Sequence, residues 1–183
     1  MKRISQLILK LTGWKSVVMV EEPKKSIICV APHTSNWDFI IGKLFYWSVE
    51  RKTSFLMKKS WFFFPMGSLF RAMNGIAIDR SKSNSVVQQM IDEFAKHQKM
   101  HLAITPEGTR KRNEKWKLGF YHIAIGAEVP IQLAYVNFQK KEMGIKEVFY
   151  PTGDEKTDLE HIYTYYKENA GPKFPERFAI PEN

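Results

Sequence analysis

Short apolar runs alternate with segments of helical periodicity along most of the chain, and this alternation constrains the fold more than any other feature. The runs are rich in β-branched and aromatic residues, which is typical of buried strands. They cover residues 27–31, 53–57, 75–78, 101–105, 130–138 and 146–150. Helical spacing marks residues 39–49, 85–97 and 118–127. The pattern predicts an α/β fold with a mixed, largely parallel sheet flanked by helices.

The length and composition favour a single domain over residues 1–183. A chain of 183 residues, of which 44% are hydrophobic and 26% charged, can bury one sizeable core. The only cysteine, Cys29, lies in an apolar run, so we expect a small buried hydrophobe and no internal disulfide. Residues 171–183 contain three prolines and are expected to form an irregular tail.

The net charge of +9 points to an anionic partner: a nucleic acid, a phospholipid surface or a phosphorylated substrate. Charge alone does not discriminate among these three. No stretch reaches the roughly 18 to 20 uninterrupted apolar residues that span a bilayer, so no transmembrane segment is predicted.

Residues 1–15 predict an amphipathic helix. Apolar side chains recur on one helical face, and the segment carries four basic residues and no acidic ones. The apolar positions are Ile4, Leu7, Ile8, Leu11 and Trp14. Such a helix either lies in a membrane interface or packs on the protein's own core, and the sequence leaves both interpretations open.

His33 and Asp38 follow the first apolar run, at a strand-to-helix junction of the kind where open α/β sheets bind ligands. A neutral imidazole can remove a proton from a hydroxyl, and a nearby carboxylate can orient the imidazole and stabilise its charged form. Alternatively, His33 is a turn residue and Asn36 or Asp38 caps the following helix. The spacing alone does not decide between these interpretations.

Three further stretches stand out. In Thr105–Arg110, Gly108 permits a tight turn and Arg110 offers a planar fork for a phosphate, although a solvated basic turn would have the same composition. Gly75–Arg80 is an alternating strand with a charged end. Glu128–Leu133 begins a strand with a proline.

Together, these four stretches resemble the motifs of the lysophospholipid and glycerol-phosphate acyltransferase family, which includes the 1-acylglycerol-3-phosphate acyltransferases that make phosphatidic acid. His33 and Asp38 match its His-x4-Asp motif, and residues 75–80 match Gly-x4-Arg. Residues 106–110 match Pro-Glu-Gly-Thr-Arg, and residues 129–131 match Val-Pro-Ile. The resemblance covers about residues 28 to 135, and its specificity comes from the set in this order.

The resemblance implies transfer of a fatty acyl group from acyl-CoA or acyl-carrier protein to a hydroxyl of a lysophospholipid or glycerol-phosphate acceptor, typically 1-acylglycerol-3-phosphate. His33 would be the general base and Asp38 its orienting carboxylate. Acceptor binding would fall to Arg80, Glu107, Gly108, Thr109 and Arg110. Residues 129–131 would support the site. No metal and no bound cofactor are implied.

The partners implied are the lipid acceptor, the thioester donor, an anionic membrane surface and, for one class of donor, acyl-carrier protein; no nucleic acid is expected. The expected location is cytoplasmic and peripheral, on the inner face of the membrane. Two other functions stay open: a thioesterase or transacylase on the same site, and a non-catalytic basic module that binds lipid or nucleic acid. The run Trp61–Phe64 either packs in the core or meets lipid, and some exposure is expected.

Overall fold

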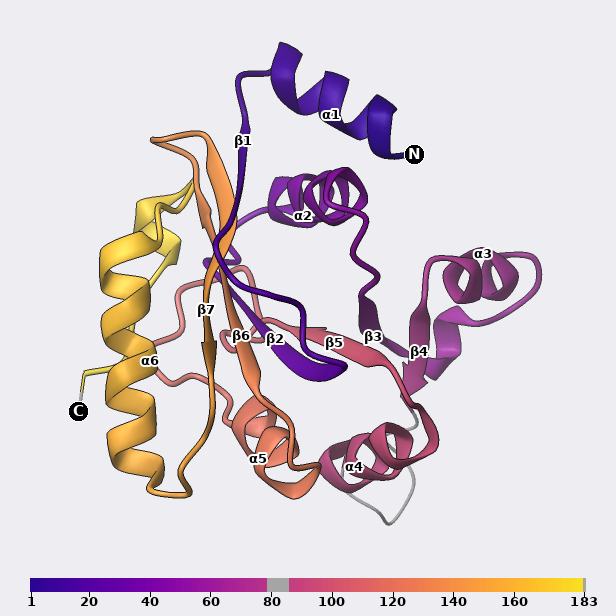
Figure 1. The fold of residues 1–183 in the computed structure, drawn as a ribbon, viewed down its shortest axis with the longest axis vertical. Helices are drawn as coiled ribbons and strands as arrows, with labels where there is room; N and C mark the ends of the chain where they lie inside the picture. Colours follow the sequence, from indigo (N-terminus) through magenta and orange to yellow (C-terminus); the bar gives the residue numbers. More distant parts are fainter. Residues whose placement is uncertain (79–85, 183) are drawn as a thin grey trace.

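A seven-stranded sheet forms the middle of the molecule (Figure 1). The computed structural model describes residues 1–78 and 86–182. Within them the strands are β1 (Lys15–Val18), β2 (Lys25–Ala31), β3 (Ser54–Lys58), β4 (Gly75–Ile78), β5 (Met100–Ile104), β6 (Ile131–Asn137) and β7 (Glu142–Phe149). Their order across the sheet is β1-β7-β6-β2-β5-β3-β4, and β6–β7 is the antiparallel pair among otherwise parallel neighbours. The predicted mixed, largely parallel sheet is confirmed.

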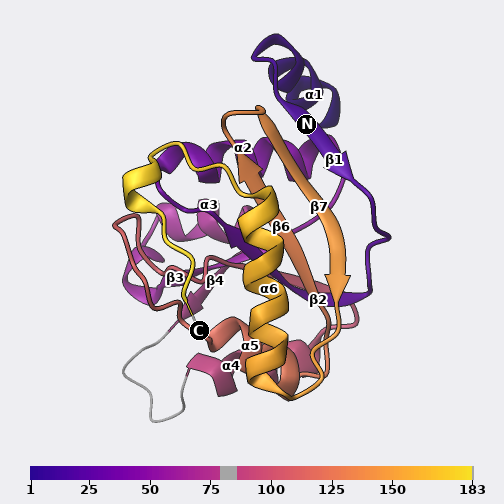
Figure 2. The ribbon, with the colours of Figure 1, turned by 90° about the vertical axis from the view of Figure 1, so that its left-hand side faces the viewer.

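Four helices cover the two faces of this sheet. The helices of the described residues are α1 (Lys2–Leu11), α2 (Asn36–Ser48), α3 (Met66–Ala72), α4 (Val86–Lys96), α5 (Gly119–Gly126) and α6 (Glu155–Asn169), with 3-10 turns η1 (Lys59–Trp61) and η2 (Pro175–Arg177). Helix α2 packs on one face, and α4, α5 and α6 lie on the other (Figure 1). Figure 2 shows α6 running along β6 and β7. The sheet is therefore the central layer of three.

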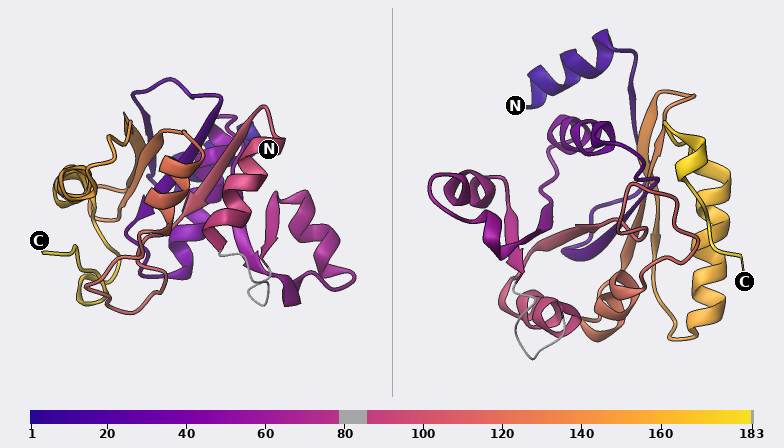
Figure 3. Two further views of the ribbon diagram at one scale, coloured as in Figure 1. Left: turned by 90° about the horizontal axis from the view of Figure 1, so that it is seen from below. Right: turned by 180° about the vertical axis from the view of Figure 1, so that it is seen from behind.

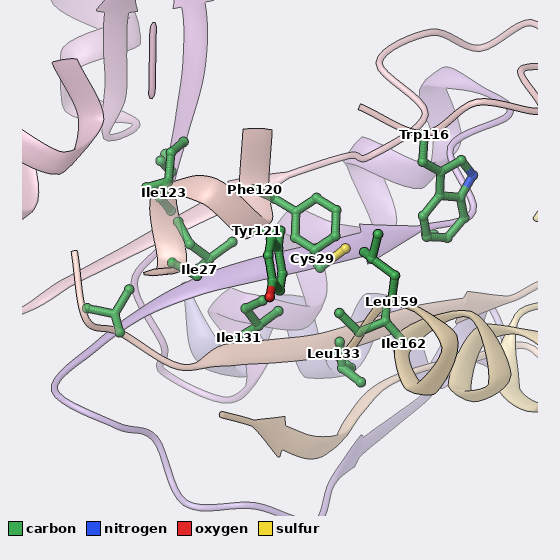
Figure 4. Close-up of a cluster of buried hydrophobic side chains, with 14 of the residues drawn as sticks. Ile27, Cys29, Trp116, Phe120, Tyr121, Ile123, Ile131, Leu133, Leu159 and Ile162 are labelled. Carbon is green, nitrogen blue, oxygen red and sulfur yellow. The ribbon is translucent and has the colours of Figure 1, made fainter. Parts of the chain in front are cut away.

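Two apolar clusters hold the layers together because the central strands are buried on both faces. Ile27, Cys29 and Ala31 of β2 belong to the cluster under α4, α5 and α6, whereas Ile28 belongs to the cluster under α2. Figure 4 shows Cys29 within the first cluster, where none of its surface is exposed. The expectation of a buried, unpaired Cys29 is confirmed.

The amino-terminal helix ends earlier than residue 15 and docks in an unexpected way. Gly13, at a φ of +77°, follows the end of α1, and β1 then begins at Lys15. The helix packs against α2, with Ser5 and Leu9 buried, and the Gln6 side-chain amide donates a hydrogen bond of 3.1 Å to the carbonyl of Ser48 in α2. Four residues of its predicted apolar face, Ile4, Leu7, Ile8 and Leu11, stay exposed. The fifth, Trp14, lies beyond the helix and packs against the apolar cluster under α2. Figure 3 shows α1 standing clear of the sheet beside α2, so the helical part of this face does not pack on the core.

The tail beyond residue 170 is mostly irregular, as predicted, but it is fastened to the body. The Trp116 indole donates a hydrogen bond of 2.9 Å to the carbonyl of Ala179, and Gly171 forms a bridge with Asn137. No helix in the described part of the chain is long and apolar enough to cross a bilayer.

Candidate active site

The two residues of the predicted dyad lie at the junction of β2 and α2, His33 in the loop and Asp38 in the first turn of the helix. Ser35 caps α2, and Asp38, in the first turn, accepts hydrogen bonds from the backbone N–H groups of Thr34 (2.6 Å) and Ser35 (2.7 Å). The Ser35 hydroxyl donates a third bond of 2.9 Å to the other carboxylate oxygen. This capping box fixes Asp38 inside the protein, with 4% of the residue exposed.

His33 lies beside this fixed carboxylate. Its Nδ1 is 3.6 Å from Oδ2 of Asp38, slightly longer than a hydrogen bond. Burial lowers the pKa of His33, and the positive charge of Arg110 lowers it further. The Asp38 carboxylate raises this pKa and so offsets part of the decrease. The imidazole is therefore largely neutral at neutral pH. Because Nδ1 faces Asp38, Nε2 is the nitrogen that can accept a proton from a substrate.

Glu107 lies behind the dyad rather than on the loop surface. Only 2% of it is exposed, and neither carboxyl oxygen completes a hydrogen bond with another described residue. Burial raises the pKa of Glu107 to about 8; the backbone N–H of His33 offsets part of this rise, and the Asp38 charge adds to it. A carboxyl in these surroundings is largely protonated at neutral pH.

The last three residues of the Pro-Glu-Gly-Thr-Arg stretch, Gly108, Thr109 and Arg110, form an exposed turn, whereas Pro106 is buried. Gly108 adopts a φ of +65°, a conformation that favours glycine; a Cβ there would meet only the flexible end of the Lys117 side chain, which can move aside. The Thr109 hydroxyl accepts from the backbone N–H of Lys111. Arg110 donates to the side-chain oxygen of Asn36, which ties this turn to the start of α2.

Parallel pairing explains why these segments meet. Strands β2 and β5 are neighbours, with Cys29 opposite Ile104, so the loops that follow them emerge at the same edge of the sheet. Strand β4 runs in the same direction and ends at Ile78. The predicted acceptor residue Arg80, with Asp79, lies outside the described residues.

The Val-Pro-Ile stretch does not join this site. Ile131 is opposite Ile27 at the start of β2, about 13 Å along the strand from the carboxyl end where His33 follows. Val129 and Ile131 are buried in the core under α5. Their role is to pack the sheet, not to contact the site.

A model of the family described as "Acyltransferase" matches residues 15–136, about two thirds of the chain. The chain belongs to the acyltransferase family. This confirms the membership that the four motifs predicted. The chain also resembles the crystal structure of the 1-acyl-sn-glycerophosphate (LPA) acyltransferase PlsC from Thermotoga maritima, with a TM-score of 0.64 and 17% sequence identity over 91% of this chain and 75% of that one. At this identity the likeness shows a shared fold. A search of curated proteins finds no match.

The dyad of this acyltransferase opens onto a cavity of about 520 Å³, within the usual range for small-molecule sites. His33, Asp38, Thr105, Gly108 and Lys117 line it near the motifs. Most of the other lining residues are apolar, including Val30, Phe39, Phe55, Met57, Ile104, Phe120, Ile123 and Met143. An apolar cavity that ends at a polar dyad suits a substrate with a long hydrocarbon chain.

Two contacts near the site were not predicted from the sequence. Lys117 covers the Gly108 turn, and its backbone N–H bonds the carbonyl of Pro106 at 2.7 Å. The Lys173 ammonium lies 5.1 Å from the ring centre of Trp37, which brings the tail next to the start of α2. These contacts join segments distant in sequence, so only the fold reveals them. Among residues 1–78 and 86–182, no three His, Cys, Asp or Glu side chains gather to form a metal site.

Proposed function

We propose that this acyltransferase moves a fatty acyl group from acyl-CoA or acyl-carrier protein to a hydroxyl of a lysophospholipid or glycerol-phosphate acceptor, with 1-acylglycerol-3-phosphate as the leading candidate and phosphatidic acid as its product. The observation that carries the proposal is a neutral histidine beside a fixed carboxylate at the mouth of an apolar cavity. The Thermotoga maritima protein of similar fold, which is named as an LPA acyltransferase, supports this choice of acceptor.

In the proposed mechanism, the acceptor hydroxyl gives its proton to Nε2 of His33 as its oxygen attacks the thioester carbonyl. Asp38 holds the ring through Nδ1 and stabilises the imidazolium that forms. The new C–O ester bond forms and the C–S bond breaks, and the departing sulfur takes the proton from Nε2. The positive end of α2 and Arg110 are the sources of charge that would stabilise the oxyanion. The mechanism uses no metal and no bound cofactor.

Acceptor binding is assigned to the turn at residues 107–110 and to Arg80. Arg110 lies in the loop after β5, where its bond to Asn36 holds it near the start of α2. Its guanidinium offers a planar fork for phosphate oxygens. Gly108 and Thr109 would supply the close backbone approach, and Glu107 would support His33 from behind. Acyl-CoA and acyl-carrier protein are both acidic, and exposed Lys111, Arg112 and Lys115 on the same loop suit either donor.

We also propose that the protein works as a peripheral protein on an anionic membrane, on the inner, cytoplasmic face. The apolar face of α1 is exposed and flanked by lysines and arginine; Leu11 alone exposes 77% of its surface. A second apolar segment, Trp61–Phe64, exposes 89% of Phe64. Helices α1 and α3, the latter directly after this second segment, both project from the body (Figure 1). Two such anchors with basic surroundings suit an interface of anionic lipids.

The reaction is tested with purified protein, a labelled acyl thioester and 1-acylglycerol-3-phosphate. His33→Ala should lower turnover at least a hundredfold, because it removes the nitrogen that accepts the proton. Asp38→Asn should also lower turnover, because it removes the charge that orients the imidazole. The matched control is His97→Ala, since His97 is exposed directly after the end of α4, where its side chain pairs with Glu93. Undiminished transfer by His33→Ala would refute the base assignment. Free fatty acid without acylated acceptor would identify a thioesterase instead.

Membrane binding is tested by flotation with vesicles of phosphatidylglycerol and phosphatidylcholine. The double change Leu7→Gln and Leu11→Gln should reduce binding at least tenfold, because it removes two exposed apolar side chains from α1. Tyr150→Gln is the control: Tyr150 is equally exposed but follows β7 near the turn into α6, at the other end of the molecule (Figure 1). Equal binding by all three proteins would contradict the anchor assignment.

A further inference from the structure

The cavity at the dyad passes through the sheet, because strands β3 and β5 separate there. Strands β3 and β5 pair at two positions, Ser54 with Leu102 and Phe55 with Ala103, and their pairing ends there. Strand β3 continues alongside β4 as far as Lys58, and β5 continues alongside β2 as far as Ile104. A gap therefore opens between β3 and β5 at the carboxyl edge of the sheet, next to the loop that carries His33.

The residues that line the cavity come from both faces of the sheet. Tyr46 and Met143 belong to the apolar cluster under α2, whereas Phe120 and Ile123 belong to the cluster under α4, α5 and α6. We call these two parts of the cavity the α2 arm and the α5 arm. Both arms reach the edge of the sheet where His33 and Asp38 lie, so both arms open at the dyad.

Each arm runs along a helix that lines it. Phe39, Gly42 and Tyr46 share one face of α2, at spacings of three and four residues, and all three line the cavity. From Asp38 to Tyr46 the helix advances about 12 Å. The α5 arm follows α5 from Gly119 to Ile123, about 6 Å along the helix.

The position of each arm indicates its occupant. The α5 arm begins beside Gly108 and Lys117, in the segment assigned to the acceptor, so a chain already attached to the acceptor would enter there. The α2 arm begins at Asp38 and Phe39, on the other side of the dyad, and leaves that space for the chain of the thioester. Direct transfer without an acyl-enzyme requires both substrates to be bound at the dyad together, and the two arms provide room for one chain each.

We infer that the cavity holds two hydrocarbon chains at the same time, the donor's acyl chain in the α2 arm and the acceptor's own acyl chain in the α5 arm. This inference rests on the proposed function. It goes further by requiring an acceptor that already carries one acyl chain, and by assigning donor and acceptor chain-length selection to separate residues.

Two glycines provide a matched test. A Cβ at Gly42 would lie 3.6 Å from Cε of Met143, an ordinary contact, and one at Gly119 would meet nothing within 4 Å. Both glycines line the cavity, one in each arm, and both are helical, so Gly42→Leu and Gly119→Leu fill an arm without straining the backbone. Ala95→Leu, on the exposed side of α4, is the control.

The measurement is kcat/KM over a series of acyl-CoA chain lengths and, separately, over acceptors that range from glycerol 3-phosphate to long-chain 1-acylglycerol 3-phosphates. Gly42→Leu should lower kcat/KM about tenfold for the longest donors and shift the donor optimum to shorter chains, as expected when about two methylenes lose their burial. Gly119→Leu should do the same for the longest acceptors. Shifts in the same profile by both variants would overturn the separate assignment.

A second measurement does not depend on turnover or on the variants. Native mass spectrometry of the wild-type protein with a non-reactive thioether analogue of acyl-CoA and long-chain 1-acylglycerol 3-phosphate should show a complex that holds both. Displacement of one by the other would overturn the two-chain inference even if transfer is observed. Formation of that complex with no transfer by the wild type to any acceptor would instead count against the proposed function alone.

Discussion

Glu107 offers the most direct test of the site's electrostatics. Its carboxyl is buried behind His33 without a completed hydrogen bond, and burial raises its pKa to about 8 from the usual 4.5. Between these two pH values the folded chain keeps a proton that the unfolded chain has lost. Because the folded state binds more protons, the stability that the neutral carboxyl provides is present below about pH 4.5 and is lost as the pH rises toward 8.

The magnitude is large. Each pH unit in this interval corresponds to about 1.4 kcal/mol, so the free energy of unfolding should fall by roughly 4 kcal/mol between pH 5 and pH 8 from Glu107 alone. That is a substantial fraction of the roughly 5 to 15 kcal/mol that stabilises an ordinary domain. Gln resembles the neutral carboxyl in shape and does not ionise. Glu107→Gln should therefore remove this slope and make the protein the more stable variant at pH 8.

Urea unfolding at half-unit steps from pH 5 to pH 8.5 measures this effect. The quantity of interest is the difference in the free energy of unfolding between Glu107→Gln and wild type, which cancels the titration of the other groups. Glu114→Gln is the control, because Glu114 is on the same loop but is exposed beside Arg112. A difference that stays constant with pH would refute the argument that Glu107 is protonated in the folded protein near neutrality.

Three further predictions concern neighbouring groups. Arg110 lowers the pKa of His33, so Arg110→Gln should move the acid limb of the kcat/KM profile to higher pH, whatever it does to the amplitude. Asp38→Ala should cost about 2 to 4 kcal/mol in urea unfolding, because the buried donors at Thr34 and Ser35 lose their acceptor. Trp116→Phe should cost about 1 kcal/mol and speed amide exchange in residues 172–182, because the indole no longer bonds the tail.

The central part of the fold was predictable because its strands are buried on both faces. Such strands appear in sequence as uninterrupted apolar runs, and those at residues 27–31 and 101–105 correspond to β2 and β5. The loops that follow these two runs bear His33 and Glu107, so most of the candidate site followed from the same pattern. Pairing between the two strands was not predicted from the sequence, since apolar runs carry no information about their neighbours.

The strands that the sequence did not predict, or predicted only in part, have weaker local signals. Strand β1 is a short edge strand that begins with the exposed polar residues Lys15 and Ser16 and contains only the first two residues of the apolar stretch at 17–20. Strand β7 begins at Glu142, earlier than the predicted 146–150, and includes Gly144 because a side chain there would lie 2.6 Å from the carbonyl oxygen of Val17. That requirement comes from β1 packing alongside, which the local sequence does not encode.

Helices α3 and α6 were also not predicted. The buried face of α6 is built largely from tyrosines, which occur in strands as readily as in helices, and so the helical spacing gave no clear indication. Its amino end does carry a local signal: Asp154 caps the helix by accepting from the backbone N–H of Thr157. Helix α3 has only seven residues, one of them Gly67, and directly follows the aromatic run.

The two interpretations of the His33 and Asp38 spacing turn out to describe the same geometry. Oδ2 of Asp38 accepts from two backbone N–H groups of the capping turn, and the same oxygen faces Nδ1 of His33. Those bonds hold the carboxylate in one position before any substrate arrives, so in the proposed mechanism it would orient His33 without a further cost in side-chain entropy. A helix cap and an orienting carboxylate need the same residue type at the same place. Local sequence therefore cannot separate them, whereas the structure has one aspartate that both caps α2 and faces the imidazole.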